Sequence, residues 1–117
     1  MNLVADERPG GIAVLSWAEV STLDASNVTE LRQRVEEIER DHSRMVFDMS
    51  RVEFIDSSVI GALVGFMREA RAAGGDVKLA VLTPDIETIF ELTRLQKVFQ
   101  IHGSVDEAVR SFEGATA

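Results

Sequence analysis

The sequence predicts a single α/β domain in which about four helices pack on a mixed, mostly parallel sheet of about five strands. Three observations support this fold class. Strand-like and helix-like apolar patterns alternate along most of the 117 residues, a turn signal separates two short strand candidates near the start, and no linker or internal repeat interrupts the chain. Strands that alternate with helices are typical of parallel sheets with crossover connections, so we expect one shared core.

The chain is predicted to open with a β-hairpin. Strand-like runs at 3–5 and 12–17 flank Pro9-Gly10-Gly11, a tripeptide typical of turns. The first helix is expected over 25–40, where apolar residues recur at spacings of three and four and so share one helical face: Val28, Leu31, Val35 and Ile38.

A strand at 45–49, a loop containing Val52 and Phe54, and a helix over 59–73 are expected next. Gly74-Gly75 is predicted to end this helix. Its apolar residues are expected to face the core: Ile60, Leu63, Val64, Met67 and Ala70.

The last third of the chain repeats the strand-helix pattern. A buried strand is predicted at 77–82, and the Thr83 hydroxyl is expected to cap a third helix whose first residue is Pro84. A final strand at 98–101 precedes a capping box formed by Ser104 and Glu107, which predicts the start of a closing helix. We expect the domain to span 1–113, and 114–117 to form a C-terminal tail.

Composition narrows the possible functions. The formal net charge of −8 disfavours binding to nucleic acid or to anionic membranes, since both are negatively charged. The absence of cysteine excludes disulfides and thiolate chemistry and suits a reducing compartment, for which the cytoplasm is the default. The sequence also lacks a signal-like start and a long apolar run, so we expect a soluble protein without membrane insertion.

Motifs for catalysis and for cofactor binding are missing from the sequence. There is no phosphate-binding loop, no dinucleotide-binding glycine pattern and no nucleophile elbow. His42 and His102 stand alone, one at a predicted helix end and one at a strand end, and neither has metal-ligand spacing. We therefore expect no enzymatic activity, no metal ion and no cofactor.

The tract Asp56-Ser57-Ser58 is the most informative polar feature of the chain. It places one carboxylate and two hydroxyls at a predicted helix start, after the strand at 45–49 and its loop. Asp56 or Ser57 could act only as the N-cap of that helix. A second hydroxyl in the first turn remains, however, and a phosphate there would lie beside the positive end of the helix dipole.

In this order and context, several tracts resemble the STAS domain of bacterial anti-sigma factor antagonists. The resemblance spans nearly the whole chain. It rests on Phe47-Asp48-Met49-Ser50, Phe54-Ile55-Asp56-Ser57-Ser58, Gly61, Gly74-Gly75, Ile89-Phe90-Glu91-Leu92-Thr93 and Glu107-Ala108.

This resemblance implies a partner-switching function controlled by phosphorylation. By position, Ser58 would accept phosphate from an anti-sigma factor that is also a serine kinase, and a PP2C-like phosphatase would remove it. The unphosphorylated form would bind the anti-sigma factor. Ser57 stays open as an alternative acceptor, and the flanking or partner-binding residues would be Asp56, Ser57, Val59, Gly61 and Asp24.

Three positions allow another role or depart from the family pattern. Asp24 lies before the first helix and could serve only as its N-cap. Val59 stands where the family usually has glycine, and so adds a β-branched side chain where a partner would approach. Arg94 also replaces a common glycine, which requires either a positive φ or a different end to the third helix.

Two other functions remain open from the sequence. Val59 motivates a constitutive, unphosphorylated STAS scaffold subunit of a stress-sensing or lipid-transport complex. A small hydrolase that uses Ser58 is the third possibility. The sequence leaves the sigma factor, the partner and the oligomeric state open.

Overall fold

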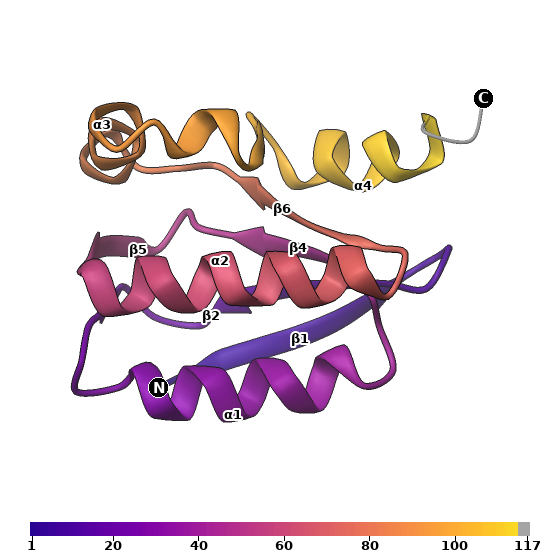
Figure 1. Ribbon diagram of the computed structural model, residues 1–117, viewed down its shortest axis with the longest axis horizontal. Helices are drawn as coiled ribbons and strands as arrows, with labels where there is room; N and C mark the ends of the chain where they lie inside the picture. The colour runs from indigo at the N-terminus through magenta and orange to yellow at the C-terminus, as the bar shows by residue number, and fades with distance from the viewer. Residues whose placement is uncertain (115–117) are drawn as a thin grey trace.

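The computed structural model describes residues 1–114 and arranges them as an open sheet with helices on both faces (Figure 1). The main sheet has the strand order β1-β2-β4-β6-β7. The first two strands form the expected antiparallel hairpin, and the other neighbours pair in parallel. The strands are β1 (Leu3–Arg8), β2 (Ile12–Trp17), β4 (Arg44–Asp48), β6 (Asp76–Ala80) and β7 (Gln100–His102).

Four α-helices complete the predicted α/β fold. Side chains of the first three helices pack on one face of the sheet, and the fourth covers the other face. A short 3₁₀ helix, η1 (Leu95–Lys97), precedes β7, so the last strand begins two residues later than expected. The helices are α1 (Val28–Glu39), α2 (Ser57–Ala72), α3 (Pro84–Leu92) and α4 (Val105–Gly114).

A second, two-stranded parallel sheet was not predicted. It pairs β3 (Ser21–Leu23) with β5 (Val52–Ile55), which the sequence pattern had assigned to loops. The two ends of β5, Val52 and Ile55, are buried and anchor this small sheet to the main core. The loop interpretation of this segment is therefore wrong.

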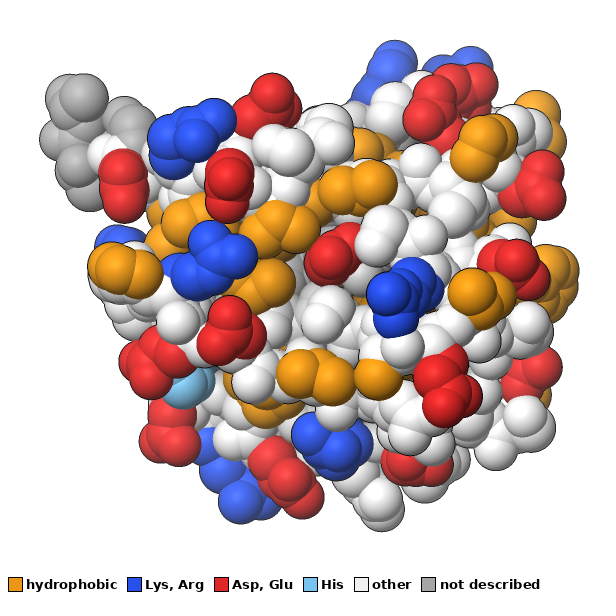
Figure 2. All heavy atoms as spheres, turned by 180° about the vertical axis from the view of Figure 1, so that it is seen from behind, with side chains coloured by type: hydrophobic (Ala, Val, Ile, Leu, Met, Phe, Trp, Pro, Cys, Tyr) orange, Lys and Arg blue, Asp and Glu red, His pale blue; other side chains and the backbone are white. Residues whose placement is uncertain are grey.

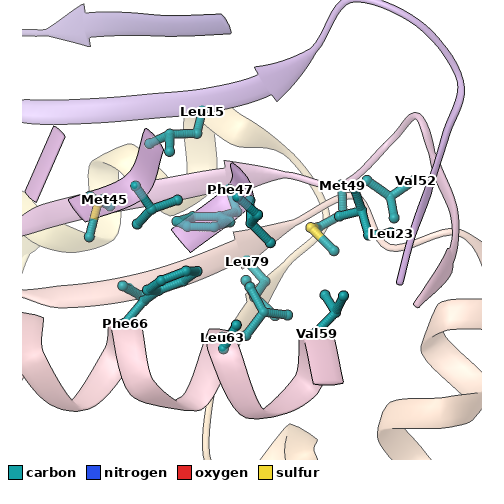
Figure 3. Close-up of a cluster of buried hydrophobic side chains, with 14 of the residues drawn as sticks. Leu15, Leu23, Met45, Phe47, Met49, Val52, Val59, Leu63, Phe66 and Leu79 are labelled. Carbon is teal, nitrogen blue, oxygen red and sulfur yellow. The ribbon is translucent and has the colours of Figure 1, made fainter. Parts of the chain in front are cut away.

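Phe47, the fourth residue of β4, lies at the centre of the main core. Its ring centroid is 6.4 Å from that of Trp17 on β2 and 6.1 Å from that of Phe66 on α2. All three side chains are buried, and Figure 3 shows Phe47 between the sheet and α2. Aromatic pairs at such separations add to the stabilisation from area burial, so Phe47 joins two strands and a helix in one contact cluster.

The buried face of α2 is rotated relative to the sequence prediction. Ile60 and Val64 were expected in the core but are only partly buried, at its margin. The fully buried residues of the helix are Val59, Ala62, Leu63, Phe66, Met67 and Ala70.

The predicted helix ends are correct in most cases. Gly74, at φ 87°, follows the C-cap of α2, as expected. Arg94 adopts φ 61°, which is the first of the two alternatives considered for that position. The Ser104 Oγ accepts a hydrogen bond from the Glu107 N–H at 3.1 Å, which confirms the predicted cap of α4.

Thr83 differs from its prediction. It is the N-cap residue of α3, but its side chain makes no capping hydrogen bond. Its hydroxyl instead donates to the Val52 carbonyl at 3.1 Å, and so joins the start of α3 to β5. The tail predicted at 114–117 begins at the last residue of α4, and residues 115–117 lie outside the described part of the chain.

Two glutamates meet where α1 packs against α2. Both Glu39 carboxyl oxygens are shielded from solvent, and no described donor reaches them when the group is ionised. Burial and a hydrogen bond shared with Glu69, together with repulsion from Glu69 and Glu36, raise the pKa of Glu39 to about 7. A proton held by Glu39 therefore joins two groups that would otherwise repel each other.

This pair predicts a pH dependence of stability. The unfolded chain ionises Glu39 near its ordinary pKa of 4.5, whereas the folded chain keeps the proton up to about pH 7. The folded state thus binds more protons in this window, so its stability falls as pH rises from 4.5 to 7. Because solvent partly screens the site, we expect Glu39→Gln to be roughly 2 kcal/mol more stable than the unsubstituted protein at pH 8, with little difference at pH 4.5.

Urea unfolding at both pH values measures this difference. Glu37→Gln, on the exposed side of the same helix, removes one negative charge without touching the pair and controls for net charge. A Glu39→Gln advantage that is the same at both pH values would contradict the assignment.

Candidate functional site

The candidate site lies at the edge of the molecule where β4, β5 and β6 end. Ser57 and Ser58 are the first residues of α2, and Asp56 alone separates this helix from β5. Figure 1 shows the start of α2, β5 and α3 at the same end of the molecule. In open α/β sheets, ligands and partners tend to meet the chain at this carboxyl edge of the strands.

The Asp56 carboxylate organises the site. Its Oδ1 accepts hydrogen bonds from the Ser58 N–H at 3.0 Å, the Val59 N–H at 3.1 Å and the Ser58 hydroxyl at 2.5 Å. Its Oδ2 accepts from the Ala25 N–H at 3.0 Å. One side chain thus caps α2 and ties it to the loop before α1.

These hydrogen bonds lower the pKa of Asp56. The Ser58 hydroxyl has the largest effect, burial opposes it, and the three backbone N–H groups add to it. The carboxylate therefore stays ionised and is a weak base. It can orient the Ser58 oxygen toward an incoming phosphoryl group, although it is poorly suited to remove a proton in advance.

The helix start differs in one respect from the sequence expectation. A phosphate was expected to lie beside the positive end of the helix dipole, but Asp56 already accepts hydrogen bonds from the N–H groups of Ser58 and Val59 at that end. A phosphate on Ser58 would therefore meet a carboxylate before it met free donors. Charge repulsion at this point would force the side chains of Asp56 and Ser58 to rearrange.

Ser57, Ser58 and Gly61 differ in how far they are exposed to solvent. Ser57 is exposed, whereas Ser58 is half-buried with its hydroxyl on Asp56. Gly61 lies one turn after Ser57 and is exposed, with no side chain near the position that a Cβ would take. Because Gly61 has no side chain, a partner could approach the backbone closely in the first two turns of α2.

Asp24 lies in the same network but does not cap α1. The N-cap residue of α1 is Asn27, and the Asp24 Oδ1 accepts hydrogen bonds from the N–H and the hydroxyl of Ser26, at 2.9 and 2.5 Å. The simple capping interpretation of Asp24 is therefore wrong. Because Ala25 bonds to Asp56, the Asp24 loop and the phosphoacceptor candidate are held together.

Val59 is not part of the accessible surface. Its side chain is fully buried and points into the core between α2 and the sheet (Figure 3). The expectation that Val59 obstructs a partner is therefore wrong, because the helix turns this residue inward. The scaffold alternative loses the observation that motivated it.

The sequence did not single out the hollow beside the site. Thr22, Phe54 and Thr83 line a depression of about 560 Å³ together with Glu53, Pro84 and Asp85. Phe54 is 48% exposed, which is unusual for a phenylalanine. Phe54 lies two residues before Asp56. If β5 had been recognised as a strand with one solvent-exposed face, this position would have placed Phe54 beside the candidate site.

The histidines lie apart from the serines. His42 Nε2 is 3.4 Å from a Glu7 carboxylate oxygen, and the ring of His102 lies in β7, where burial lowers its pKa. The Ser58 hydroxyl bonds to Asp56, and no histidine in the described chain bonds to either serine. The described residues therefore do not form the Ser-His pair of a Ser-His-Asp hydrolase.

The described residues show neither a metal-ligand cluster nor a candidate membrane-spanning helix. Figure 2 shows basic and acidic side chains interspersed on the face behind that of Figure 1.

Comparison with known proteins identifies the family. The sequence model of the STAS domain family matches residues 6–108, which is most of the chain. The protein belongs to the STAS domain family. BtrV of Bordetella bronchiseptica, a candidate anti-sigma factor antagonist by its name, is 25% identical over 116 residues, covering 98% of this STAS protein and 97% of BtrV.

Solved STAS structures share the fold. A STAS domain protein from Planctomyces limnophilus superposes with a TM-score of 0.85 at 18% identity, covering 95% of this chain and 97% of that one. The anti-sigma factor antagonist SpoIIAA in its unphosphorylated form gives 0.73 at 21% identity, with 96% and 98% covered. Bacillus SpoIIAA in its phosphorylated form gives 0.71 at 20% identity, with 94% and 98% covered.

Proposed function

We propose that this STAS protein is an anti-sigma factor antagonist controlled by phosphorylation of Ser58. When unphosphorylated it binds an anti-sigma factor that is also a serine kinase, and phosphorylation of Ser58 releases that partner. A PP2C-like phosphatase resets the switch. The protein acts as a binding module rather than as an enzyme.

The hydrogen bond between the Ser58 hydroxyl and Asp56, at the accessible carboxyl edge of the sheet, carries this proposal. It holds a serine oxygen in a defined position within reach of another molecule. The exposed Phe54 and the hollow around it supply apolar contact area on the same edge. The names of BtrV and SpoIIAA support the choice of partner class.

The Asp56 network explains how one phosphate could change the whole docking edge. A phosphate on Ser58 carries a charge of about −1.5 to −2 and three acceptor oxygens, so it cannot replace the hydroxyl as a donor to Asp56. The carboxylate then loses its shortest hydrogen bond and is repelled. Because Asp56 also holds the Ala25 N–H, the change extends to the Asp24 loop.

We expect Ser58→Asp to weaken binding to the anti-sigma factor kinase at least tenfold, which corresponds to about 1.4 kcal/mol. Ser58→Ala keeps a small, uncharged side chain at this position, so it should bind like the unsubstituted protein. Calorimetric titration of each variant with the purified kinase measures both affinities.

The neighbouring serine supplies the matched control. Ser57→Asp introduces the same charge one residue away. The Ser57 side chain is exposed and makes no hydrogen bond to Asp56, so this variant should change the affinity little. Incubation with kinase and ATP should add phosphate to Ser57→Ala but not to Ser58→Ala, as read by intact mass. Equal, undiminished binding by Ser58→Asp and Ser57→Asp would refute the switch, whereas loss only with Ser57→Asp would move it to Ser57.

A further inference from the structure

A second polar hollow lies at the opposite edge of the sheet, where β4 and β6 begin. It has a volume of about 340 Å³, within the range of pockets for small ligands. Arg44 and Asp76, the first residues of the two strands, lie side by side in register. The lining consists of Arg44, Gly74, Gly75, Asp76, Lys78, Gln100 and Phe112.

Lys78 is the only charged residue within the described chain that is buried, with 3% of its surface exposed. Its ammonium donates to the Ser111 hydroxyl at 2.6 Å and lies 4.0 Å from the centroid of the Phe112 ring. An ammonium has three N–H donors, so the single hydroxyl leaves it short of acceptors. No carboxylate of residues 1–114 forms an ion pair with it.

Arg44 adds a second unbalanced cation. It is half-buried, and its guanidinium makes no hydrogen bond or ion pair within the part of the chain that the structure describes. Asp76, the register partner of Arg44, forms no ion pair with it among the described residues. Its carboxylate accepts from Arg71 Nε at 2.9 Å and from the Val77 N–H at 2.8 Å.

The local charge is opposite in sign to that of the whole protein. The lining carries two positive side chains, Arg44 and Lys78, and one negative side chain, Asp76, so its net charge is +1 in a chain whose formal charge is −8. The Asp76 carboxylate is also paired with Arg71, which leaves both lining cations without an ion-pair partner among the described residues. Burial lowers the pKa of Lys78, Asp76 raises it and Arg44 lowers it. Such an arrangement is stabilised when an anion enters the hollow, because the anion balances both cations.

We propose that this hollow binds a phosphate-like oxyanion. The planar guanidinium of Arg44 can donate two parallel N–H bonds to a tetrahedral oxyanion, a geometry that a spherical ion such as chloride cannot use. Lys78 supplies a shielded positive charge, and the exposed amide of Gln100 can add a donor. The oxyanion is either free phosphate or the phosphate group of a small monoester.

Titration of ¹⁵N-labelled full-length protein with inorganic phosphate, at ionic strength held constant with chloride, tests the proposal. We expect saturable amide shifts centred on Arg44, Lys78 and Gln100, together with a higher melting temperature. Arg44→Gln should weaken phosphate binding at least tenfold. Arg32→Gln, which removes an exposed arginine from α1, should leave it unchanged.

Two further arms make the result decisive. Lys78→Met keeps an apolar chain against Phe112 and removes the charge, so it should also weaken binding even if Arg44→Gln perturbs β4. A parallel titration with glycerol 3-phosphate separates the sources, since binding only of inorganic phosphate indicates the free ion and binding of both indicates a monoester site. Absence of saturable shifts with either probe, or equal affinity in both variants and the Arg32→Gln control, would overturn the proposal.

Discussion

Phe47→Ala is expected to lower the free energy of unfolding by about 3–5 kcal/mol, the usual range for removing a fully buried aromatic side chain. The Phe47 side chain is fully buried and contacts the rings of both Trp17 and Phe66. Its removal leaves a cavity between β2, β4 and α2 that these elements cannot close without shifting the sheet. Since small domains have only about 5–15 kcal/mol of stability, the variant should be close to unfolding at 37 °C.

Urea unfolding followed by far-ultraviolet circular dichroism measures this loss and avoids the fluorescence of Trp17, whose surroundings change in the variant. Phe54→Ala removes the same side chain from a position that is 48% exposed, and should cost less than about 1 kcal/mol. Similar losses for the two variants would show that the core is not centred on Phe47. Phe54→Ala also tests the docking edge, because it should weaken partner binding without unfolding the domain.

The sequence was sufficient to predict the α/β class, the opening hairpin and the four helices, because each depends on patterns within one segment. Apolar spacings of three and four, the Pro9-Gly10-Gly11 turn and the Ser104–Glu107 cap are all local signals. Each of them is visible without knowledge of the partner segment. Their agreement with the structure reflects local preferences that match the final fold.

The β3–β5 sheet could not be predicted in the same way. Its strands have three and four residues, too few to show an alternating pattern, and within residues 1–114 they pair only with each other. The pairing is stabilised from outside by the buried ends of β5 and by the Thr83 hydroxyl on the Val52 carbonyl. Such support is a tertiary effect that leaves little trace in the sequence.

Val59 shows how a small error in the predicted rotation of a helix about its axis changes a functional interpretation. Placing the core face of α2 on Ile60 and Val64 leaves Val59 outside, where it would face a partner. The spacing of Val59 to Leu63 and on to Phe66 and Met67 is equally helical and gives the correct face. A rotation of the helix by about one residue therefore separates a docking residue from a core residue.

The sequence predicts the place of the Asp56-Ser57-Ser58 tract at a helix start, but not the hydrogen bonds that surround it. The Asp56-Ser57-Ser58 tract and its place at the start of α2 follow from local signals, and the structure agrees with both. The hydrogen bond from the Ala25 N–H to Asp56 joins residues 31 positions apart, and no sequence pattern announces it. This bond holds the Asp24 loop beside Asp56, the hydrogen-bond partner of the Ser58 hydroxyl.

Gly75→Ala is expected to destabilise the protein by about 3 kcal/mol, at the upper end of the range for overpacking. A Cβ at Gly75 would overlap the carbonyl oxygen of Ser43, which is backbone and cannot rotate away. The same carbonyl accepts the Asp76 N–H at 3.0 Å, so any retreat would break the contact that aligns the start of β6 with the approach to β4. Thermal and urea unfolding of the purified variant measure the loss.

Gly61→Ala is the matched control, because it makes the same change where a Cβ meets no neighbouring atom. Gly61 is exposed within α2, so alanine there should raise stability by about 0.5–1 kcal/mol through its better helix propensity. The opposite signs distinguish a steric requirement at Gly75 from a general effect of losing glycine. If Gly75→Ala were neutral, the close approach of the two chain segments at the start of the sheet would have to be looser than the structure indicates.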